Sequence, residues 1–585
     1  MGTELPEWLK SKYSILQNKF GTREFSYEQA TRILEENKDD KKTVANVLSE
    51  LEKAGFIEMK SGSSNNKAIY KLKPREEWKE IFSVGQKVTR NTIESILKKA
   101  ADLIRTRVDY KFILILLFYK RISDKWELEY EKEYRKALAD GLSEEKAREE
   151  ARNYRFHTFD LPEEFLWDNI RKDVDKLPES FSQALKALGE RNKVLKDVVD
   201  RTDFIQFTTS TENAEILRQL VELFSEKKLQ HVSPDILGDA YEWVLRYFAP
   251  TKAKEGEVYT PREVIKLLVE MLDPEPGESV YDPCCGSGGM LITSYNHVKE
   301  EHGEEEVRRL FLYGEEVNPM TYALCKMNLY IHDIIDVNIQ MGDTLLYPKF
   351  LEHNSLKKFD VVIANPPWNQ DGYGKDTLKK ADFWKQRFKH GPSPNQSADW
   401  VWMQHMTMSA KKANGRVGVV IDNGCLFRGG KEKRIRAKVL EQDLIECVIL
   451  LPEKLFYNTG APGAIIVFNR KKPKERKGKV LFINASDEYE QHPDVRKLSR
   501  LGEENISKIA EVYKEFNDMK GFAKAVSLDR IKENDRNLNV PLYVFPSVET
   551  EEIDLNREWE GLEEIEEELG KLKERIKGFL KEVDK

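Results

Sequence analysis

The stretch Phe359-Asp-Val-Val-Ile-Ala-Asn-Pro-Pro-Trp368 decides how the rest of the chain can be interpreted. Its first six residues are mostly apolar and rich in β-branched side chains, which is typical of a buried parallel strand. Two prolines then end the strand, because neither can donate a hydrogen bond to a neighbouring strand. Asn365 is therefore expected at the carboxyl end of a strand, with Trp368 just beyond it. In open α/β sheets, ligands bind at the carboxyl ends of the strands.

These four residues suit the methylation of a planar amine such as that of adenine. The exocyclic nitrogen of adenine is a poor nucleophile, because its lone pair is delocalised into the ring. The side-chain oxygen of Asn365 and the carbonyl of Pro366 could accept its N–H bonds and stabilise the charge that develops as a methyl group arrives. Trp368 offers an aromatic face for a base flipped out of the stack. A Pro-Pro turn that merely ends a strand, with Trp368 in the core, is the alternative. The predicted catalytic residues are Asn365, Pro366, Pro367 and Trp368.

Length, charge and cysteine content limit the possible classes of protein. A chain of 585 residues implies several domains, at roughly 150 residues each. The net charge is only −7, so any nucleic-acid surface must be a local patch. The five cysteines include no CxxC pair, which predicts no metal site and a reducing, cytoplasmic location. The most apolar run, Phe112 to Tyr119, is far shorter than the roughly 20 residues that span a bilayer. It predicts a buried helix and no membrane contact.

Residues 1–80 predict a winged-helix-like domain. Ser26 can cap a first helix, and two strands are expected at Phe56–Lys60 and Lys67–Leu72. Such a unit often places its second helix in the major groove of DNA. The exposed face of that helix is mixed rather than basic, so DNA contact and protein docking both remain open. Apolar residues of the second helix recur three and four apart: Val44, Val47, Leu48 and Leu51.

The remaining chain divides into three further ranges. Residues 87–250 carry helical patterns almost throughout and predict a packing and docking domain. Residues 251–485 alternate strand and helix, which predicts an α/β domain with a parallel sheet. Residues 486–585 predict a C-terminal helical region. The expected strands are Ser279–Asp282, Phe311–Glu315, Val337–Met341, Phe359–Ala364, Arg416–Ile421, Ile445–Leu450 and Ala464–Phe468. The last could be antiparallel, because the connection before it is short.

Three motifs follow the first three of these strands. Asp282-Pro-Cys-Cys-Gly-Ser-Gly-Gly289 would let the backbone turn sharply and approach a ligand. Glu316 follows the second strand, where an acid typically holds ribose hydroxyls, and Asp343 follows the third, where it could accept a bond from an adenine amine. Taken singly, each is as readily a tight turn or a charge at a helix start. Together with Asn365 to Trp368 at the end of the fourth strand, these three motifs would line one crevice. The glycine spacing fits neither an ATP phosphate loop nor a dinucleotide fingerprint.

With these motifs in this order, the chain resembles the modification (M) subunit of type I restriction–modification systems, a family of N6-adenine DNA methyltransferases of the gamma arrangement. The resemblance covers roughly residues 87–585, and the winged-helix-like start departs from it. It also rests on Glu257-Val-Tyr-Thr-Pro-Arg262, Phe456-Tyr-Asn-Thr-Gly460 and Asn537-Leu-Asn-Val-Pro541. It implies a Rossmann-like sheet that binds S-adenosylmethionine (SAM). The residues implied to hold SAM are Glu257, Val258, Tyr259, Thr260, Pro261, Arg262, Asp282, Gly286, Ser287, Gly288, Glu316 and Asp343.

The resemblance also implies the reaction and the partners. The reaction is methyl transfer from SAM to the N6 amine of adenine in a specific double-stranded DNA sequence, which protects host DNA. The partners are a specificity (S) subunit, a second M subunit and a restriction (R) subunit. An N-methyltransferase acting on protein glutamine or RNA, or a non-catalytic DNA-binding assembly module, is the alternative.

Three further segments predict contacts with DNA or with a partner. Asn369 to Asp399 is long and lacks apolar periodicity, which predicts a mobile, DNA-facing flap. Arg428 to Lys438 is a basic run that could contact phosphates, although an ordinary solvated helix face is the favoured interpretation. Residues from about 556 to 585 predict a helix with a heptad seam, and the resemblance implies that this tail docks on the S subunit. The seam consists of Leu562, Ile565, Leu569, Leu572, Ile576, Phe579 and Val583.

Overall fold

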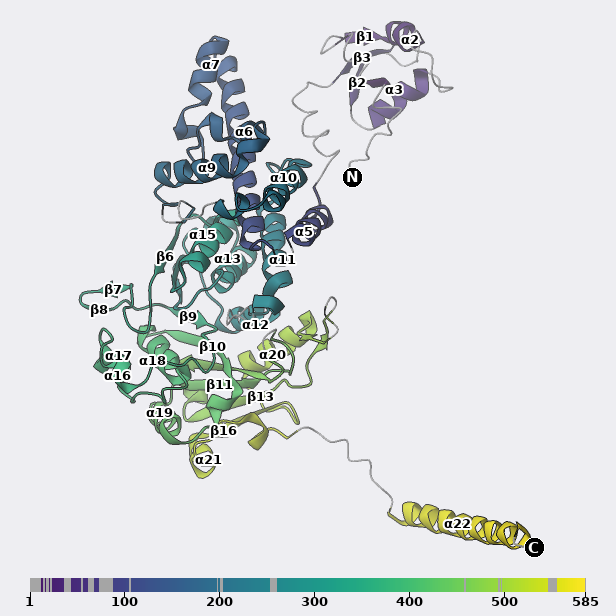
Figure 1. Cartoon of the computed structure of the whole chain (residues 1–585), viewed down its shortest axis with the longest axis vertical. Coiled ribbons are helices and arrows are strands. Elements are labelled where there is room, and N and C mark those ends of the chain that lie inside the picture. Colours follow the sequence, from purple (N-terminus) through teal and green to yellow (C-terminus); the bar gives the residue numbers. More distant parts are fainter. Residues whose placement is uncertain are drawn as a thin grey trace. The chain divides into compact units, whose positions relative to one another are not determined.

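The computed structural model of the chain (Figure 1) shows two compact units, residues 1–248 with 326–334 and residues 249–325 with 335–585. None of the helices in the described ranges is long and apolar enough to cross a membrane. The structure describes residues 12–13, 16, 20, 24–35, 44–53, 56–61, 68–72, 88–104, 107–196, 198–199, 204–252, 260–456, 459–492, 495, 497–545 and 555–583.

The first unit begins with a small three-stranded antiparallel sheet and two helices, which match the winged-helix-like prediction. Ser26 Oγ accepts a hydrogen bond from Gln29 N (3.3 Å) and Gln29 Oε1 accepts one from Ser26 N (2.8 Å), a reciprocal cap of the first helix. The predicted apolar face of the second helix is buried. The elements are β1 (Glu24–Ser26), α2 (Tyr27–Glu35), α3 (Val44–Lys53), β2 (Ile57–Ser61) and β3 (Ile69–Leu72), with sheet order β1-β3-β2.

The rest of the first unit is helical, as predicted. The apolar run from Phe112 to Tyr119 is buried within one long helix, which confirms the expected core helix. The longer helices of this region are α5 (Arg90–Ile104), α6 (Lys111–Ala139), α7 (Glu144–Ala151), α9 (Leu177–Arg191), α10 (Thr211–Ser225) and α11 (Pro234–Lys252).

The second unit contains a nine-stranded sheet of order β16-β13-β11-β12-β10-β9-β4-β5-β6. The five neighbouring strands β10, β9, β4, β5 and β6 run parallel, and β12 is antiparallel to both β10 and β11. The predicted Rossmann-like sheet and its reversed strand are therefore confirmed. The strands are β4 (Ser279–Asp282), β5 (Phe311–Glu316), β6 (Val337–Met341), β9 (Val361–Ala364), β10 (Arg416–Asp422), β11 (Ile445–Leu450), β12 (Gly463–Asn469), β13 (Lys479–Asn484) and β16 (Ala523–Ser527).

Two strands of this sheet were not among the expected ones. β13 is parallel to β11, and β16 is antiparallel to β13. The sheet thus continues beyond residue 485, where the sequence suggested a division between the catalytic domain and a C-terminal region. The four sequence ranges themselves stay a prediction.

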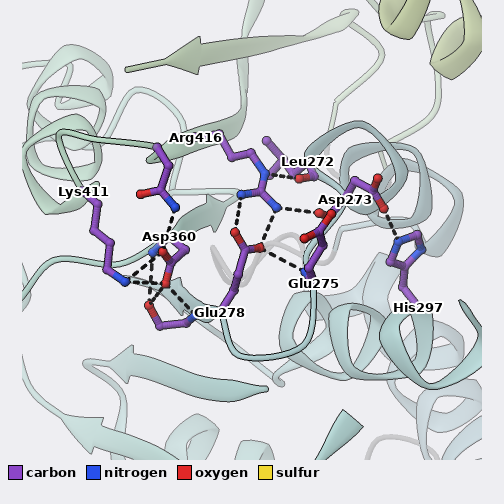
Figure 2. Close-up of polar contacts among 10 residues, drawn as sticks. Leu272, Asp273, Glu275, Glu278, His297, Asp360, Lys411 and Arg416 are labelled. Carbon is purple, nitrogen blue, oxygen red and sulfur yellow. Dashed lines mark hydrogen bonds and ion pairs between the residues drawn. The ribbon is translucent and has the colours of Figure 1, made fainter. Parts of the chain in front are cut away.

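The amino ends of three central strands are joined by partly buried ion pairs. Asp360, before β9, accepts hydrogen bonds from Ser279 N (2.9 Å) in β4, from Lys411 Nζ (2.8 Å) and from Asn414 Nδ2 (3.1 Å). Figure 2 shows Arg416, the first residue of β10, between Glu278 and the carbonyls of Leu272 and Asp273 at the end of α12 (Arg262–Leu272). These contacts hold β4, β9 and β10 together and so help to align their opposite, carboxyl ends.

The predicted heptad tail is one helix, α22 (Leu555–Val583). Five residues of its apolar seam are more than half exposed, from 51% at Ile576 to 66% at Ile565. The side chains of Phe579 and Val583 lie outside the described residues. The helix is confirmed, and a partner for its seam stays a prediction.

Candidate functional site

The glycine loop joins β4 to α13 (Gly289–His302). Gly286 (φ +52°) and Gly288 (φ +86°) adopt left-handed backbone conformations that favour glycine. The loop is tightened by hydrogen bonds from Cys284 N to Asp282 Oδ1 (3.0 Å) and from Gly288 N to the carbonyl of Cys285 (2.7 Å). A Cβ on Gly286 would meet no heavy atom within 4 Å. The loop therefore presents backbone beside open space.

Glu316, at the end of β5, faces this loop. Its Oε2 accepts a hydrogen bond from Gly286 N (3.1 Å), and its Oε1 accepts one from Asn318 N (2.8 Å). Its neighbour Glu315 is fully buried and accepts bonds from Tyr281 Oη (2.7 Å) and Lys349 N (3.1 Å) instead. Glu315 is thus bonded within the interior, and Glu316 is the acid that contacts the glycine loop.

Asp343 follows β6, and the turn that contains it is hydrogen-bonded to the glycine loop and to the end of β5. Gly342 N donates to the carbonyl of Glu316 (2.9 Å), and Thr344 Oγ1 donates to the carbonyl of Pro283 (2.7 Å). Asp343 itself accepts bonds from Leu346 N (3.0 Å) and Tyr373 Oη (2.9 Å). The three strand-end turns that the sequence singled out therefore form one connected wall.

The electrostatics of the loop suit a cationic ligand. Asp282 is 2% exposed, and this burial raises its pKa to about 8, with Glu316 contributing in the same direction against the hydrogen bond from Cys284. A positive charge placed at the loop would favour the ionised carboxylate.

Asn365 is fixed at the carboxyl end of β9 by two side chains. Its Nδ2 donates to Thr260 Oγ1 (2.7 Å), and its Oδ1 accepts from Trp368 Nε1 (2.9 Å). An indole N–H can only donate, so this contact orients the amide with its oxygen toward Trp368. Trp368 is half-buried and packs against Phe456, with ring centroids 4.7 Å apart. Trp368 therefore lies only partly inside the core.

The structure brings most of the predicted site residues to neighbouring strand ends. Pro366 is buried and Pro367 half-buried beside Asn365. Thr260 and Pro261 precede α12, which begins at Arg262, and Ser287 lies within the glycine loop. Glu257, Val258 and Tyr259, as well as Tyr457 and Asn458 of the Phe456–Gly460 motif, lie outside the described residues.

The segment expected to be a mobile flap is instead folded against the turn after β6 and against α18 (Asp399–Ser409). It contains α16 (Lys375–Leu378) and α17 (Trp384–Arg387). Arg387 is fully buried and donates to the carbonyls of Thr344 (2.7 Å) and Leu345 (2.9 Å). At its start, Asn369 N donates to Asp399 Oδ1 (2.9 Å) in α18 (Asp399–Ser409). Tyr373 and Arg387 were missed as contributors to the site, because only the fold brings them to Asp343 and Thr344.

The basic run is partly structural. It lies in and just before α19 (Gly430–Leu440), where Arg436 is 1% exposed and donates to the carbonyls of Cys425 (3.1 Å) and Arg536 (2.7 Å). Arg428 pairs with Asp399 and Asp422. The side chains of Arg428 and Arg436 are therefore occupied by contacts within the protein, whereas Lys431 and Lys438 are exposed.

The sheet, the glycine loop and the Asn-Pro-Pro-Trp edge define the class of methyltransferases that act on planar amines. The chain belongs to the N-6 DNA methylase family, whose pattern matches residues 232–552. The HsdM N-terminal domain matches residues 93–224. It is thus an adenine-specific DNA methyltransferase, as the resemblance implied.

Individual relatives agree with this family. The MjaVIII and MjaVII type I restriction enzyme methylase subunits of Methanocaldococcus jannaschii are 44% and 42% identical to the chain, and each match covers 99% of this chain and 98% of the relative. A solved type I restriction-modification methyltransferase subunit from Streptococcus thermophilus superposes with a TM-score of 0.67 at 26% identity, over 78% of this chain and 100% of that one.

Proposed function

We propose that this chain binds SAM at the glycine loop and transfers its methyl group to the N6 amine of adenine in a specific double-stranded DNA sequence, as the modification subunit of a type I restriction–modification complex. One observation carries the proposal: the amide of Asn365 is held with its oxygen toward Trp368, at the strand end next to β4 and its loop. A host-protecting modification requires access to cellular DNA, so a cytoplasmic location belongs to this proposal.

The turns after β4, β5 and β6 suit the amino-acid, ribose and adenine parts of SAM. The loop backbone from Gly286 to Gly288, which borders open space at Gly286, would lie against the amino-acid part. Glu316 would accept bonds from the ribose hydroxyls and Asp343 from the adenine amine. Thr260, Pro261 and Arg262 would close the other side, together with Glu257, Val258 and Tyr259. When bound, SAM supplies an electrophilic methyl group on a sulfonium.

Four residues would prepare the target base. Asn365 Oδ1 and the carbonyl of Pro366 would accept the two N–H bonds of the adenine amine, which favours a pyramidal nitrogen and stabilises the developing positive charge. Pro367 would keep this edge rigid. Trp368 would stack on the flipped base, and its N–H would leave the Asn365 oxygen as the amine takes its place.

The partners of this function follow from the family and from α22. The exposed seam of that helix would dock on an S subunit, which reads the DNA sequence. A second M subunit and a restriction (R) subunit would complete the assembly. The exposed side chains of Leu562, Ile565 and Leu569 are the surface that such a partner would cover.

Methylome sequencing tests the proposal directly. The chain is co-expressed with its S subunit in a host that lacks other adenine methylation, and we expect N6-methyladenine at one specific motif. Asn365→Ala should abolish the modification while SAM binding by the full chain, measured by calorimetry, changes little. Unmodified DNA with an intact, SAM-binding complex would instead favour the protein or RNA alternative. Near-normal methylation by the variant would contradict the mechanism.

A further inference from the structure

The carboxylate of Asp343 is held from two directions. Its Oδ1 accepts a hydrogen bond from Leu346 N within its own turn (3.0 Å). Its Oδ2 accepts one from the hydroxyl of Tyr373 (2.9 Å), 30 residues further along the chain. Tyr373 belongs to the segment that follows the Asn365 edge. A residue outside every motif of the cofactor site therefore determines how Asp343 is oriented.

Tyr373 is equipped to act as the donor in this pair. Burial raises the pKa of its hydroxyl, and the nearby Asp343 carboxylate raises it further. The phenol therefore keeps its proton at neutral pH and donates, while the carboxylate accepts. A carboxylate offers about four acceptor positions on its two oxygens. The contact with Tyr373 thus leaves Asp343 able to accept a bond from a ligand amine.

The backbone around Tyr373 holds the hydroxyl in place. Gly372 N donates to the carbonyl of Asn395 (3.1 Å). A Cβ on Gly374 would lie 2.5 Å from Asn395 Oδ1, so the chain passes close beneath that side chain. Tyr373 and Cys284 of the glycine loop pack against the same apolar cluster, which includes Leu345. The tyrosine therefore lies on the side of the glycine loop and the Asp343 turn.

We propose that Tyr373 is a positioning residue of the cofactor pocket, which orients the Asp343 carboxylate to accept a hydrogen bond from the 6-amino group of the cofactor's adenine. This inference rests on the proposed function, in which Asp343 receives that amine. It makes the folded segment after the catalytic edge one wall of the cofactor pocket. It also gives the pocket a means to select a 6-amino purine. The 6-oxygen of a 6-oxo purine is a hydrogen-bond acceptor and would face the Asp343 carboxylate, which also only accepts.

Calorimetry on the full-length chain tests this role with two ligands. Tyr373→Phe removes only the hydroxyl, and we expect it to weaken SAM binding by about three- to tenfold, the equivalent of one hydrogen bond. For an analogue of SAM whose purine lacks the 6-amino group, we expect the same substitution to change affinity less than about twofold. In an Asp343→Asn background, Tyr373→Phe should have no further effect on SAM binding.

Tyr347→Phe is the matched control, since Tyr347 is an exposed tyrosine (49%) near the same turn. It should bind both ligands as the wild type does. The inference is overturned if Tyr373→Phe binds SAM normally, or if it weakens both ligands equally, which would mean that Tyr373 only packs. A wild-type chain that binds SAM while Tyr373→Phe has no effect overturns this inference alone. A wild-type chain that fails to bind SAM overturns the proposed cofactor site as well.

Discussion

Asn365 donates from Nδ2 to the hydroxyl of Thr260, 105 residues earlier in the sequence, across 2.7 Å. The opposite end of the same amide accepts from the Trp368 indole. The orientation of the proposed catalytic oxygen is thus set before any base arrives. Such preorganisation lowers the reorganisation needed in the transition state.

Thr260→Val should slow methyl transfer at saturating SAM by about ten- to a hundredfold, because the amide loses the acceptor that holds its nitrogen. Thr260→Ser, which retains the hydroxyl, should stay close to wild type. Single-turnover methylation by the complex with its S subunit gives the rate, and calorimetry gives the SAM affinity. A lower SAM affinity with an unchanged saturated rate would show that Thr260 is only a cofactor ligand.

Gly463→Ala should disturb the aromatic contact between Phe456 and Trp368 at the proposed catalytic edge. The added Cβ would lie 2.6 Å from Phe456 Cε2 and 3.0 Å from Trp368 Cη2, so one of the two rings must shift. We expect a loss of about 1–3 kcal/mol in the free energy of unfolding, as for other overpacked sites, and a loss of methylation larger than that stability change explains. Gly429→Ala is the control, because its Cβ would meet nothing within 4 Å. Equal activity of the two variants would contradict the prediction.

SAM affinity should rise with pH across the pKa of Asp282. Burial holds that pKa at about 8 in the ligand-free chain, and a cationic ligand binds better once the carboxylate is ionised. We therefore expect affinity to increase several-fold from about pH 6.5 to 8.5 and then level off. Asp282→Asn should flatten this dependence in calorimetric titrations. A wild-type profile that falls over the same interval would contradict the assignment.

Asp360→Asn should destabilise the sheet in a pH-dependent manner. Burial alone would raise the pKa of Asp360, but its bonds from Lys411, Ser279 and Asn414 outweigh that effect and leave the pKa lowered. The resulting stability is present above the unfolded pKa and is lost as pH falls through the folded value. We expect a deficit of about 1–3 kcal/mol at neutral pH. Urea denaturation should show that the difference in unfolding free energy between wild type and variant disappears below about pH 4. A difference that grows in acid would refute this role of Asp360.

Leu569→Glu should prevent assembly without unfolding the chain. Leu569 is 52% exposed in the centre of the α22 seam, so a charge there costs little in the isolated chain and much in a helical interface. Size-exclusion chromatography with the co-expressed S subunit should show the loss of the complex. Glu568→Gln, beside the seam, is the control and should assemble. A stable complex with Leu569→Glu would place the S subunit elsewhere.

Much of the sheet was predictable because its signals are local. β4 and β6 have the bounds that their apolar runs predicted, and β9 ends at Ala364, where the prolines begin. β16 was missed, because its alternating Ala523–Ser527 pattern is weak and only pairing with β13 makes it a strand. The segment after Trp368 lacked periodicity because its order comes from distant contacts, such as those of Arg387.

Local sequence is enough to place Asn365, the glycine loop, Glu316 and Asp343 after parallel strands, because strand ends and turns depend on neighbouring residues. The side chains that orient these groups come from distant segments and are known only from the folded chain. Glu315 and Glu316 are adjacent in sequence, yet burial assigns the first to Tyr281 and leaves the second to Gly286. The contacts of Thr260 with Asn365 and of Tyr373 with Asp343 join segments far apart in the chain. Such pairs leave no periodic pattern, because their spacing is set by how the loops pack.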